Sequence, residues 1–186
     1  MVMASLRDLG FWLAVLGGLG LVAGAGMLAF PAAVRRGLDA FPRSKAPGWI
    51  LTAIGVFWVS WVVYHASLGR FDVLKPAVPV GAVVLFGAMV LFLDELLAPR
   101  ALGGLLLLLA NPMLMGVRWA DSAWRYVVVL IAYAWVIAGC ALMLHPWLFR
   151  RMTERFLGSA DVLRRMGWLK LAGSAVLLAA GFWHLR

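Results

Sequence analysis

Asp94 and Glu95 are adjacent carboxylates, and Arg100 follows them closely in the sequence. A pair of carboxylates beside an arginine can bind a cation, relay a proton or orient a polar headgroup. His145 ends another apolar segment, which the topology below places at the same side of a membrane. We therefore expect Asp94, Glu95, Arg100 and His145 to form one inner ligand-binding cluster. The alternative is a water-exposed helix end at which Arg100 pairs with Glu95 or Asp94.

A second set of polar residues consists of Asn111, Arg118 and Asp121. Pro112 follows Asn111, and we expect it to interrupt a helix, because proline lacks an amide hydrogen and clashes with the preceding turn. Interrupted helices expose backbone groups to substrates in transporters. These residues are therefore predicted to form an outer polar cluster, which a cavity would have to join to the inner one. The simpler alternative is a proline kink whose freed carbonyl finds a neighbouring donor.

The segment 48–68 carries the most polar aromatic face of the chain. Trp58, Trp61 and His65 are three and four residues apart, which places them on one side of a helix. A stripe in 126–147 that could face them consists of Tyr126, Tyr133 and Cys140. Amphipathic aromatic side chains within membrane helices commonly find partners on a neighbouring helix. We expect an interhelical hydrogen-bonded core here, with a ligand pocket as the alternative.

The elements that carry these residues are membrane-type helices. Hydrophobic residues make up 65% of the 186 residues and charged residues 13%, whereas soluble domains average roughly 45–50% and about 25%. A bilayer core about 30 Å thick requires about 20 apolar residues per helix. The chain, 1–186, is therefore predicted to be a single all-α integral membrane domain, a bundle of six transmembrane helices at approximately 9–30, 48–68, 77–97, 101–117, 126–147 and 167–184.

Residues 21–36 (LVAGAGMLAFPAAVRR) and 136–151 (VIAGCALMLHPWLFRR) are similar, and each precedes a basic loop and a helix that opens with Gly-Trp. This pattern indicates two related hairpins, 9–68 and 126–184, with the hairpin 77–117 between them in sequence. We expect a pseudo-two-fold axis along the membrane normal to relate them. The first segment also resembles a cleavable signal peptide, but its likeness to a segment deep in the chain favours a retained helix.

Basic residues set the orientation, because cytoplasmic loops collect Lys and Arg. Six spans with the N-terminus outside place eleven of the 17 Lys and Arg residues inside, mostly in 35–45 and 150–170. A re-entrant segment at 101–117, the alternative to a full span, would send these two basic stretches to opposite sides. We therefore expect a multi-pass protein of a bacterial cytoplasmic membrane with both termini outside.

Glycines mark one face of the first helix. They recur at steps of seven, three and four residues, so that a neighbouring helix can approach closely at Gly10, Gly17, Gly20 and Gly24. We expect this face to be a helix-packing seam. The alternative is that the glycines leave room for a lipid tail or another ligand.

The basic stretch 150–166 has apolar residues at roughly helical spacing, namely Met152, Phe156, Leu163 and Met166. The pattern predicts an interfacial helix, broken near Gly158-Ser159, whose arginines contact lipid phosphates. A docking surface for a cytoplasmic partner is the alternative.

Sequence signatures of enzymes are missing. The chain has no Gly-rich phosphate loop, no zinc-type His/Glu pair, no Gly-x-Ser-x-Gly elbow and no Cys-x-x-Cys. We expect no catalytic residue, metal or cofactor. The formal net charge is +9, but the basic residues cap helix ends, which favours anionic lipid headgroups over nucleic acid as the partner.

Three functions remain compatible with these observations. The leading hypothesis is a non-catalytic membrane protein that is a structural or accessory component of a larger assembly, or a homo-oligomer, and uses its glycine face and aromatic surfaces. The second is a small transporter or lipid-handling protein that uses the two polar clusters. The third is a membrane enzyme on a lipid-linked substrate, with Asp94, Glu95 or His145 as general base.

Overall fold

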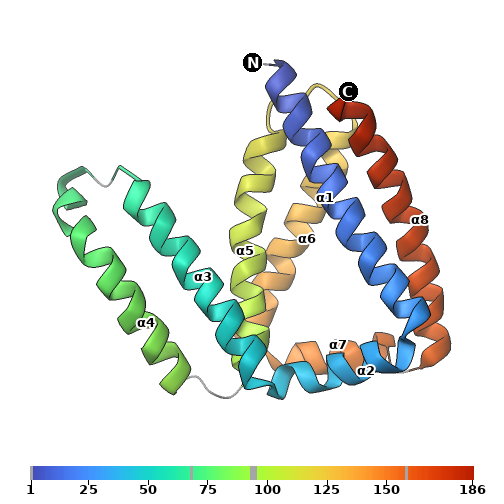
Figure 1. Cartoon of the computed structure of the whole chain (residues 1–186), viewed down its shortest axis with the longest axis horizontal. Coiled ribbons are helices and arrows are strands. Elements are labelled where there is room, and N and C mark those ends of the chain that lie inside the picture. Colours follow the sequence, from blue (N-terminus) through green and yellow to red (C-terminus); the bar gives the residue numbers. More distant parts are fainter. Residues whose placement is uncertain (1, 68, 93–95, 158) are drawn as a thin grey trace.

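The computed structural model describes residues 2–67, 69–92, 96–157 and 159–186, and the regular elements in these ranges are all helices (Figure 1). Six segments are long and apolar enough to cross a membrane, so the all-α architecture with six such segments is confirmed. Their helices are α1 (Val2–Ala29), α3 (Lys45–His65), α4 (Val78–Phe92), α5 (Leu97–Val117), α6 (Trp124–Leu144) and α8 (Ala160–Leu185). The 3₁₀ helix η2 (Gly69–Ala77) leads directly into α4.

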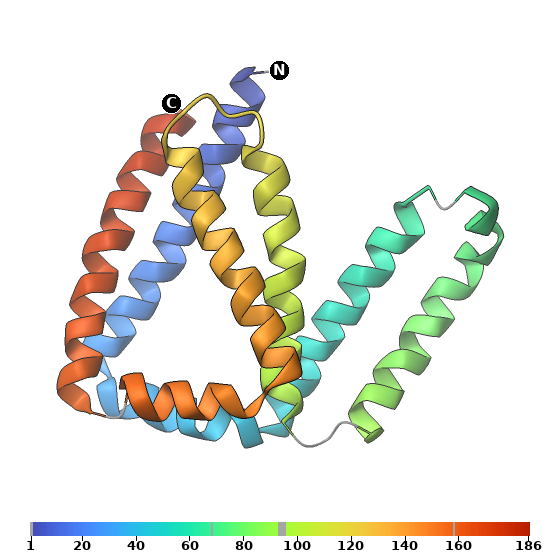
Figure 2. The same cartoon turned by 180° about the vertical axis from the view of Figure 1, so that it is seen from behind.

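Two short helices, α2 (Pro31–Ala40) and α7 (Trp147–Leu157), lie side by side across one end of the molecule (Figures 1 and 2). The ring centroids of Phe41, in the 3₁₀ helix η1 (Phe41–Arg43), and Phe149 are 5.1 Å apart at their contact. We call this end the basic end, because α2, α7 and the residues beside them include Arg35, Arg36, Arg43, Arg150, Arg151, Arg155, Arg164 and Arg165. Both chain termini lie at the opposite end, the terminal end (Figure 1).

Each short helix begins at a proline corner. Phe30 (φ −132°, ψ 54°) and His145 (φ −130°, ψ 71°) leave the helical region just before Pro31 and Pro146. A proline ring clashes with the backbone of the residue before it and disfavours the α conformation there. α1 and α6 therefore stop at equivalent positions of the two similar sequence segments, and the chain turns across the basic end.

The predictions for the two basic segments need correction. Residues 31–40 were expected in a loop but form α2, since Pro31 is well suited to a first helical turn and Val34 and Leu38 recur at helical spacing. In 150–166, α7 ends at Leu157 and α8 begins at Ala160, so a break falls where it was expected, but the residues after it are the start of the long helix α8. Ser159 is the N-cap of α8, and its Oγ accepts a hydrogen bond of 3.2 Å from the Val162 amide, so Leu163 and Met166 belong to α8.

α1 packs along α8 through small residues. The four glycines predicted to form a packing seam all lie against α8 of the same chain, at Gly10, Gly17, Gly20 and Gly24. A Cβ atom on Gly17 would lie only 2.7 Å from the backbone nitrogen of Leu178. Gly167 and Gly181 make the contact equally close from the α8 side. The glycine face is therefore occupied within the chain and is not open to a partner protein.

α5 is the central helix of the other half of the molecule and packs against both α6 and α3. Gly103 and Gly139 oppose each other, and a Cβ atom on either would lie 2.7 Å from the carbonyl oxygen of the other. Gly48, at the start of α3, faces the first turn of α5. α4 packs against α3, and this pair extends away from the remaining helices (Figures 1 and 2).

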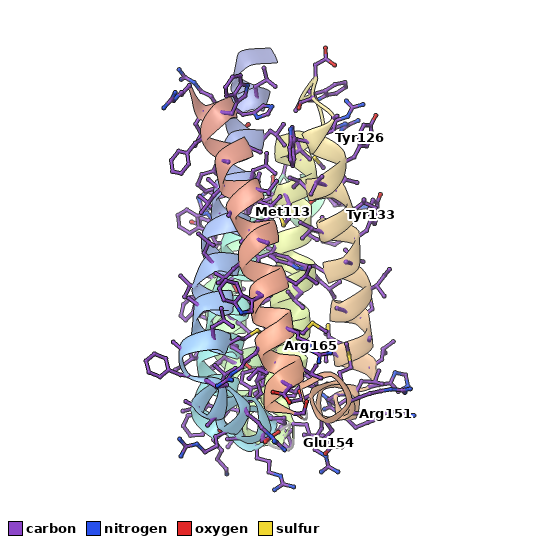
Figure 3. All side chains as sticks on the ribbon, turned by 90° about the vertical axis from the view of Figure 1, so that its right-hand side faces the viewer. Met113, Tyr126, Tyr133, Arg151, Glu154 and Arg165 are labelled. Carbon is purple, nitrogen blue, oxygen red and sulfur yellow. The ribbon has the colours of Figure 1, made fainter. Side chains whose placement is uncertain are left out.

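The hydrophobic core lies at the terminal end, where α1, α5, α6 and α8 converge (Figure 1). Its fully buried large side chains include Leu9, Leu13, Met113, Val117 and Val128. Figure 3 shows Met113 between the helices. Toward the basic end the pair α1–α8 separates from the pair α5–α6 (Figures 1 and 2), while the helices within each pair stay in contact at Gly24 and at Gly139.

α5 runs without a break through Asn111 and Pro112, so the predicted interruption is wrong. A proline inside a helix costs about 3 kcal/mol, because it removes a hydrogen bond and crowds the preceding turn. Met113 and Val117, which follow Pro112, are buried in the core, and their packing offsets this cost. The fourth segment is thus a helix of full length, Leu97–Val117.

We predict that Gly17→Leu lowers the free energy of unfolding by about 1–3 kcal/mol, because the new side chain must push α8 away from α1. Gly18→Leu is the matched control, since a Cβ atom at Gly18 meets nothing within 4 Å. Thermal unfolding of the purified variants in mild detergent measures the difference. Equal melting temperatures for the two variants would contradict the α1–α8 contact.

Candidate functional site

A pocket of about 580 Å³ lies between α3, α4 and α5. This volume is in the range of sites that hold small molecules, roughly 300–1,000 Å³. The walls come from all three helices, with Met143 of α6 at one edge, and the lining residues are Leu51, Thr52, Gly55, Val56, Val59, Ser60, Leu85, Met89, Leu97, Arg100, Ala101, Gly104, Leu105, Leu107, Leu108 and Met143. All of them except Thr52, Ser60 and Arg100 are apolar or glycine.

Two glycines leave the space open. A Cβ atom on Gly104 would meet nothing within 4 Å, and one on Gly55 would meet only Leu105, at an ordinary contact distance of 3.7 Å. Leu85 and Met89 of α4 form the opposite wall. The pocket therefore exists because α4 packs on α3 while small residues face it from α3 and α5.

The polar groups of the pocket differ in their hydrogen bonding. The Ser60 hydroxyl donates to the Val56 carbonyl oxygen at 2.7 Å. The Thr52 Oγ1 and Arg100 Nε atoms are buried and have no hydrogen-bond partner in the described part of the chain. Leaving a buried polar group unpaired costs about 1–3 kcal/mol, and more for a charged group. These two atoms are the natural anchors for a polar group of a ligand.

Arg100 lies in the first turn of α5, at the basic end (Figure 2). The sequence placed Pro99 and Arg100 in a loop, but α5 begins at Leu97, because proline is tolerated in a first helical turn. The first turn of a helix also carries unpaired amide groups and a partial positive charge. Arg100 and the start of α5 together form an electropositive edge of an otherwise apolar pocket.

The basic end carries a second, smaller pocket of about 370 Å³, beside α7. It is lined by Leu96, Trp147, Arg150, Arg151 and Glu154. The Arg150 Nε lies 3.2 Å from the Glu154 Oε1, and the Arg151 guanidinium lies 5.8 Å from the centre of the Trp147 ring. Figure 3 shows Arg151 and Glu154 projecting from α7 at this end. This surface suits the headgroup layer of a membrane, where arginine and tryptophan are both favoured.

The inner cluster predicted from the sequence is only partly described. Asp94 and Glu95 lie outside the described residues. His145 is exposed at the corner between α6 and α7, with its ring centroid 6.2 Å from that of Trp147, and it lines neither pocket. Arg100 is therefore the single described member of that cluster that reaches the larger pocket.

The outer cluster lies away from the larger pocket. Asn111 is exposed on α5, while Arg118 and Asp121 are exposed in the turn between α5 and α6 at the terminal end. The Arg118 guanidinium stacks on its neighbour, 4.9 Å from the centroid of Trp119. The pocket lining includes none of the three residues, and the buried core fills the terminal end. Neither of the two pockets described above reaches this outer cluster.

The two aromatic stripes do not meet, so the predicted hydrogen-bonded core is wrong. α5 packs against both α3 and α6 and lies between them. Trp61 and His65 are exposed and contact each other along α3, with ring centroids 4.2 Å apart. Tyr126 and Tyr133 are exposed and point outward from α6 (Figure 3).

The pocket residues that sequence reasoning missed are small or weakly polar, chiefly Thr52, Gly55 and Gly104. One sequence pattern could have indicated the two residues of α3. Thr52, Gly55 and Val59 recur at steps of three and four residues on one face of α3. A face of small residues is ambiguous, because it serves a close helix contact as well as a pocket.

Comparisons of the chain with protein-family models, with curated proteins and with solved structures gave no match.

We predict that Thr52→Val leaves the stability of purified protein with an empty pocket unchanged or raises it by up to about 1 kcal/mol, because it removes an unpaired buried hydroxyl. The matched control is Thr153→Val. The two threonines are 4% and 7% exposed, but Thr153 Oγ1 donates to the Phe149 carbonyl oxygen at 2.9 Å. That variant should lose about 0.5–1.5 kcal/mol. Thermal unfolding compares them, and an equal loss for both would mean that Thr52 has a partner.

Proposed function

We propose that this chain is a non-catalytic integral membrane protein that binds a lipid in the pocket between α3, α4 and α5. The observation that carries this proposal is a pocket with almost wholly apolar walls and one arginine at its edge, on the basic side of a bundle of six apolar helices. A lipid has the same division into a long apolar body and a small polar end.

Support for membrane insertion comes from the outer surface of the helices. Large apolar side chains are exposed on every long helix, for example Val22, Phe57, Leu91, Leu130 and Trp183. Exposed apolar patches of this extent mark a membrane or protein interface. Because six segments are long enough to span a membrane, surrounding lipid is the simplest way to cover the apolar surface on all sides of the bundle.

Support for the orientation comes from the basic end. α2 and α7 lie across the ends of the long helices, as helices in the plane of a membrane surface do (Figure 1). Their arginines belong on the cytoplasmic side, next to anionic headgroups. We therefore place the basic end in the cytoplasm and both termini outside, with a bacterial cytoplasmic membrane as the expected location.

Lipid binding ranks ahead of the other functions for structural reasons. The accessory-subunit hypothesis used the glycine face, which α8 of the same chain covers. A transporter would need a cavity that joins the predicted clusters, whereas the pocket stays on one side of α5. The enzyme hypothesis named three candidate general bases, of which Asp94 and Glu95 lie outside the described residues and His145 lines neither pocket.

The orientation predicts the labelling of engineered cysteines. In a Cys140→Ala background, Ala40→Cys at the basic end and Ala123→Cys in the turn at the terminal end are both exposed. A membrane-impermeant maleimide should label Ala123→Cys in intact cells and Ala40→Cys only after permeabilisation. Labelling of both from the same side would overturn the six-span topology.

The pocket predicts that Gly104→Phe displaces a bound lipid, because the new ring has space only in the pocket. Gly173→Phe on α8 is the matched control, since its Cβ position is equally open but lies outside the pocket. Native mass spectrometry of protein purified in mild detergent should detect lipid on the wild type and on Gly173→Phe, and at least about tenfold less on Gly104→Phe. Equal lipid retention by both variants would refute the pocket as the site.

A further inference from the structure

We infer that the pocket ligand is a phospholipid with a net negative headgroup, whose phosphate pairs with Arg100 while an acyl chain lies along α3, α4 and α5. This inference rests on the proposed function, which gives the pocket a lipid. It adds the charge of the headgroup and the residue that selects it.

The charge of the pocket supports an anionic ligand. Arg100 is the one ionisable residue among the described residues of the lining, and its Nε is buried without a hydrogen-bond partner there. A partly buried cation is stabilised when an anion with matching geometry joins it. The planar guanidinium can donate two parallel hydrogen bonds to phosphate oxygens, which distinguishes arginine from lysine.

The position of Arg100 fits the depth of a headgroup. Arg100 is in the first turn of α5 at the basic end, whereas Leu108 lines the pocket farther along the same helix. The lining from residue 97 to residue 108 of α5 extends roughly 16 Å along the helix axis. A lipid with its phosphate at Arg100 would direct its acyl chain toward the middle of the bundle, as lipids of the cytoplasmic leaflet do.

The second unpaired group of the pocket is a further donor for an anionic headgroup. The Thr52 hydroxyl lines the same pocket and lacks a partner in the described part of the chain. The two free oxygens of a phosphodiester can each accept more than one hydrogen bond, so one headgroup phosphate has sites for a guanidinium and a hydroxyl together. The arginines of α2 and α7 lie at the same end of the molecule and would raise the local concentration of anionic lipid.

The test is a titration of delipidated protein in mild detergent with phosphatidylglycerol and phosphatidylethanolamine of identical acyl chains, read by native mass spectrometry. Both lipids carry the phosphate, but only phosphatidylethanolamine adds an ammonium group, which Arg100 would repel. We therefore expect the wild type to bind phosphatidylglycerol about tenfold more tightly than phosphatidylethanolamine. Arg100→Gln should lose that preference, and Arg100→Lys should keep part of it. Arg43→Gln is the control, because Arg43 is an exposed arginine at the same end that does not line the pocket.

Each of the following outcomes of the titration would overturn one part of the inference or the proposed function. If the wild type binds both lipids equally, or if Arg100→Gln still prefers phosphatidylglycerol, selection by Arg100 is refuted. Pairing of Arg100 with Asp94 or Glu95 would produce the first of these results. Displacement of phosphatidylglycerol by an equal concentration of a fatty acid would refute the requirement for a phosphate group.

If Gly104→Phe abolishes binding of both lipids but the wild type prefers neither, the headgroup inference fails and the proposed function survives. If Gly104→Phe binds both lipids like the wild type, the proposed function itself fails.

Discussion

The two proline corners are the constraint on which the rest of the structure depends. Phe30 and His145 leave the helical region before Pro31 and Pro146, where the α conformation is disfavoured, so the chain turns across the basic end twice, through helices of ten and eleven residues. These helices cover roughly 15 Å each. α1 and α3, and likewise α6 and α8, are therefore held apart at the basic end, and each long helix needs a partner from elsewhere in the chain.

The partners differ between the two helices that carry the similar sequence segments. α1 lies against α8 along a glycine face, whereas α6 and α3 are both packed on α5. Gly24 and Gly139 occupy equivalent positions in the similar segments, yet Gly24 lies against α8 and Gly139 against Gly103 of α5. Insertion of α5 between α3 and α6 breaks the symmetry that the sequence suggests. The insertion also leaves α4 with α3 as its main contact, and the proposed lipid pocket lies in the space between α4 and α5.

The pocket combines features that disfavour an empty state. Thr52 and Arg100 each bury an unpaired polar atom, and the apolar walls gain nothing from water. Outside the pocket, Thr153 follows the usual rule that buried polar groups are paired. Within the described part of the chain, the two buried side-chain atoms without a partner both lie in this pocket, and departures from local rules are expected at functional sites.

The sequence by itself determined the number and type of the long apolar elements, but not the short helix α2. Apolar length predicts six helices of spanning size, Pro31 and Pro146 mark their ends, and the glycine spacing of the first helix indicates a close helix contact, because these are local or periodic properties of the chain. Only the tertiary structure decided which helices meet. It placed Gly17 against Leu178, separated Trp61 from Tyr133 by α5, and brought Thr52 and Arg100 to one pocket, since such contacts depend on how the long helices are arranged and no local pattern encodes that arrangement.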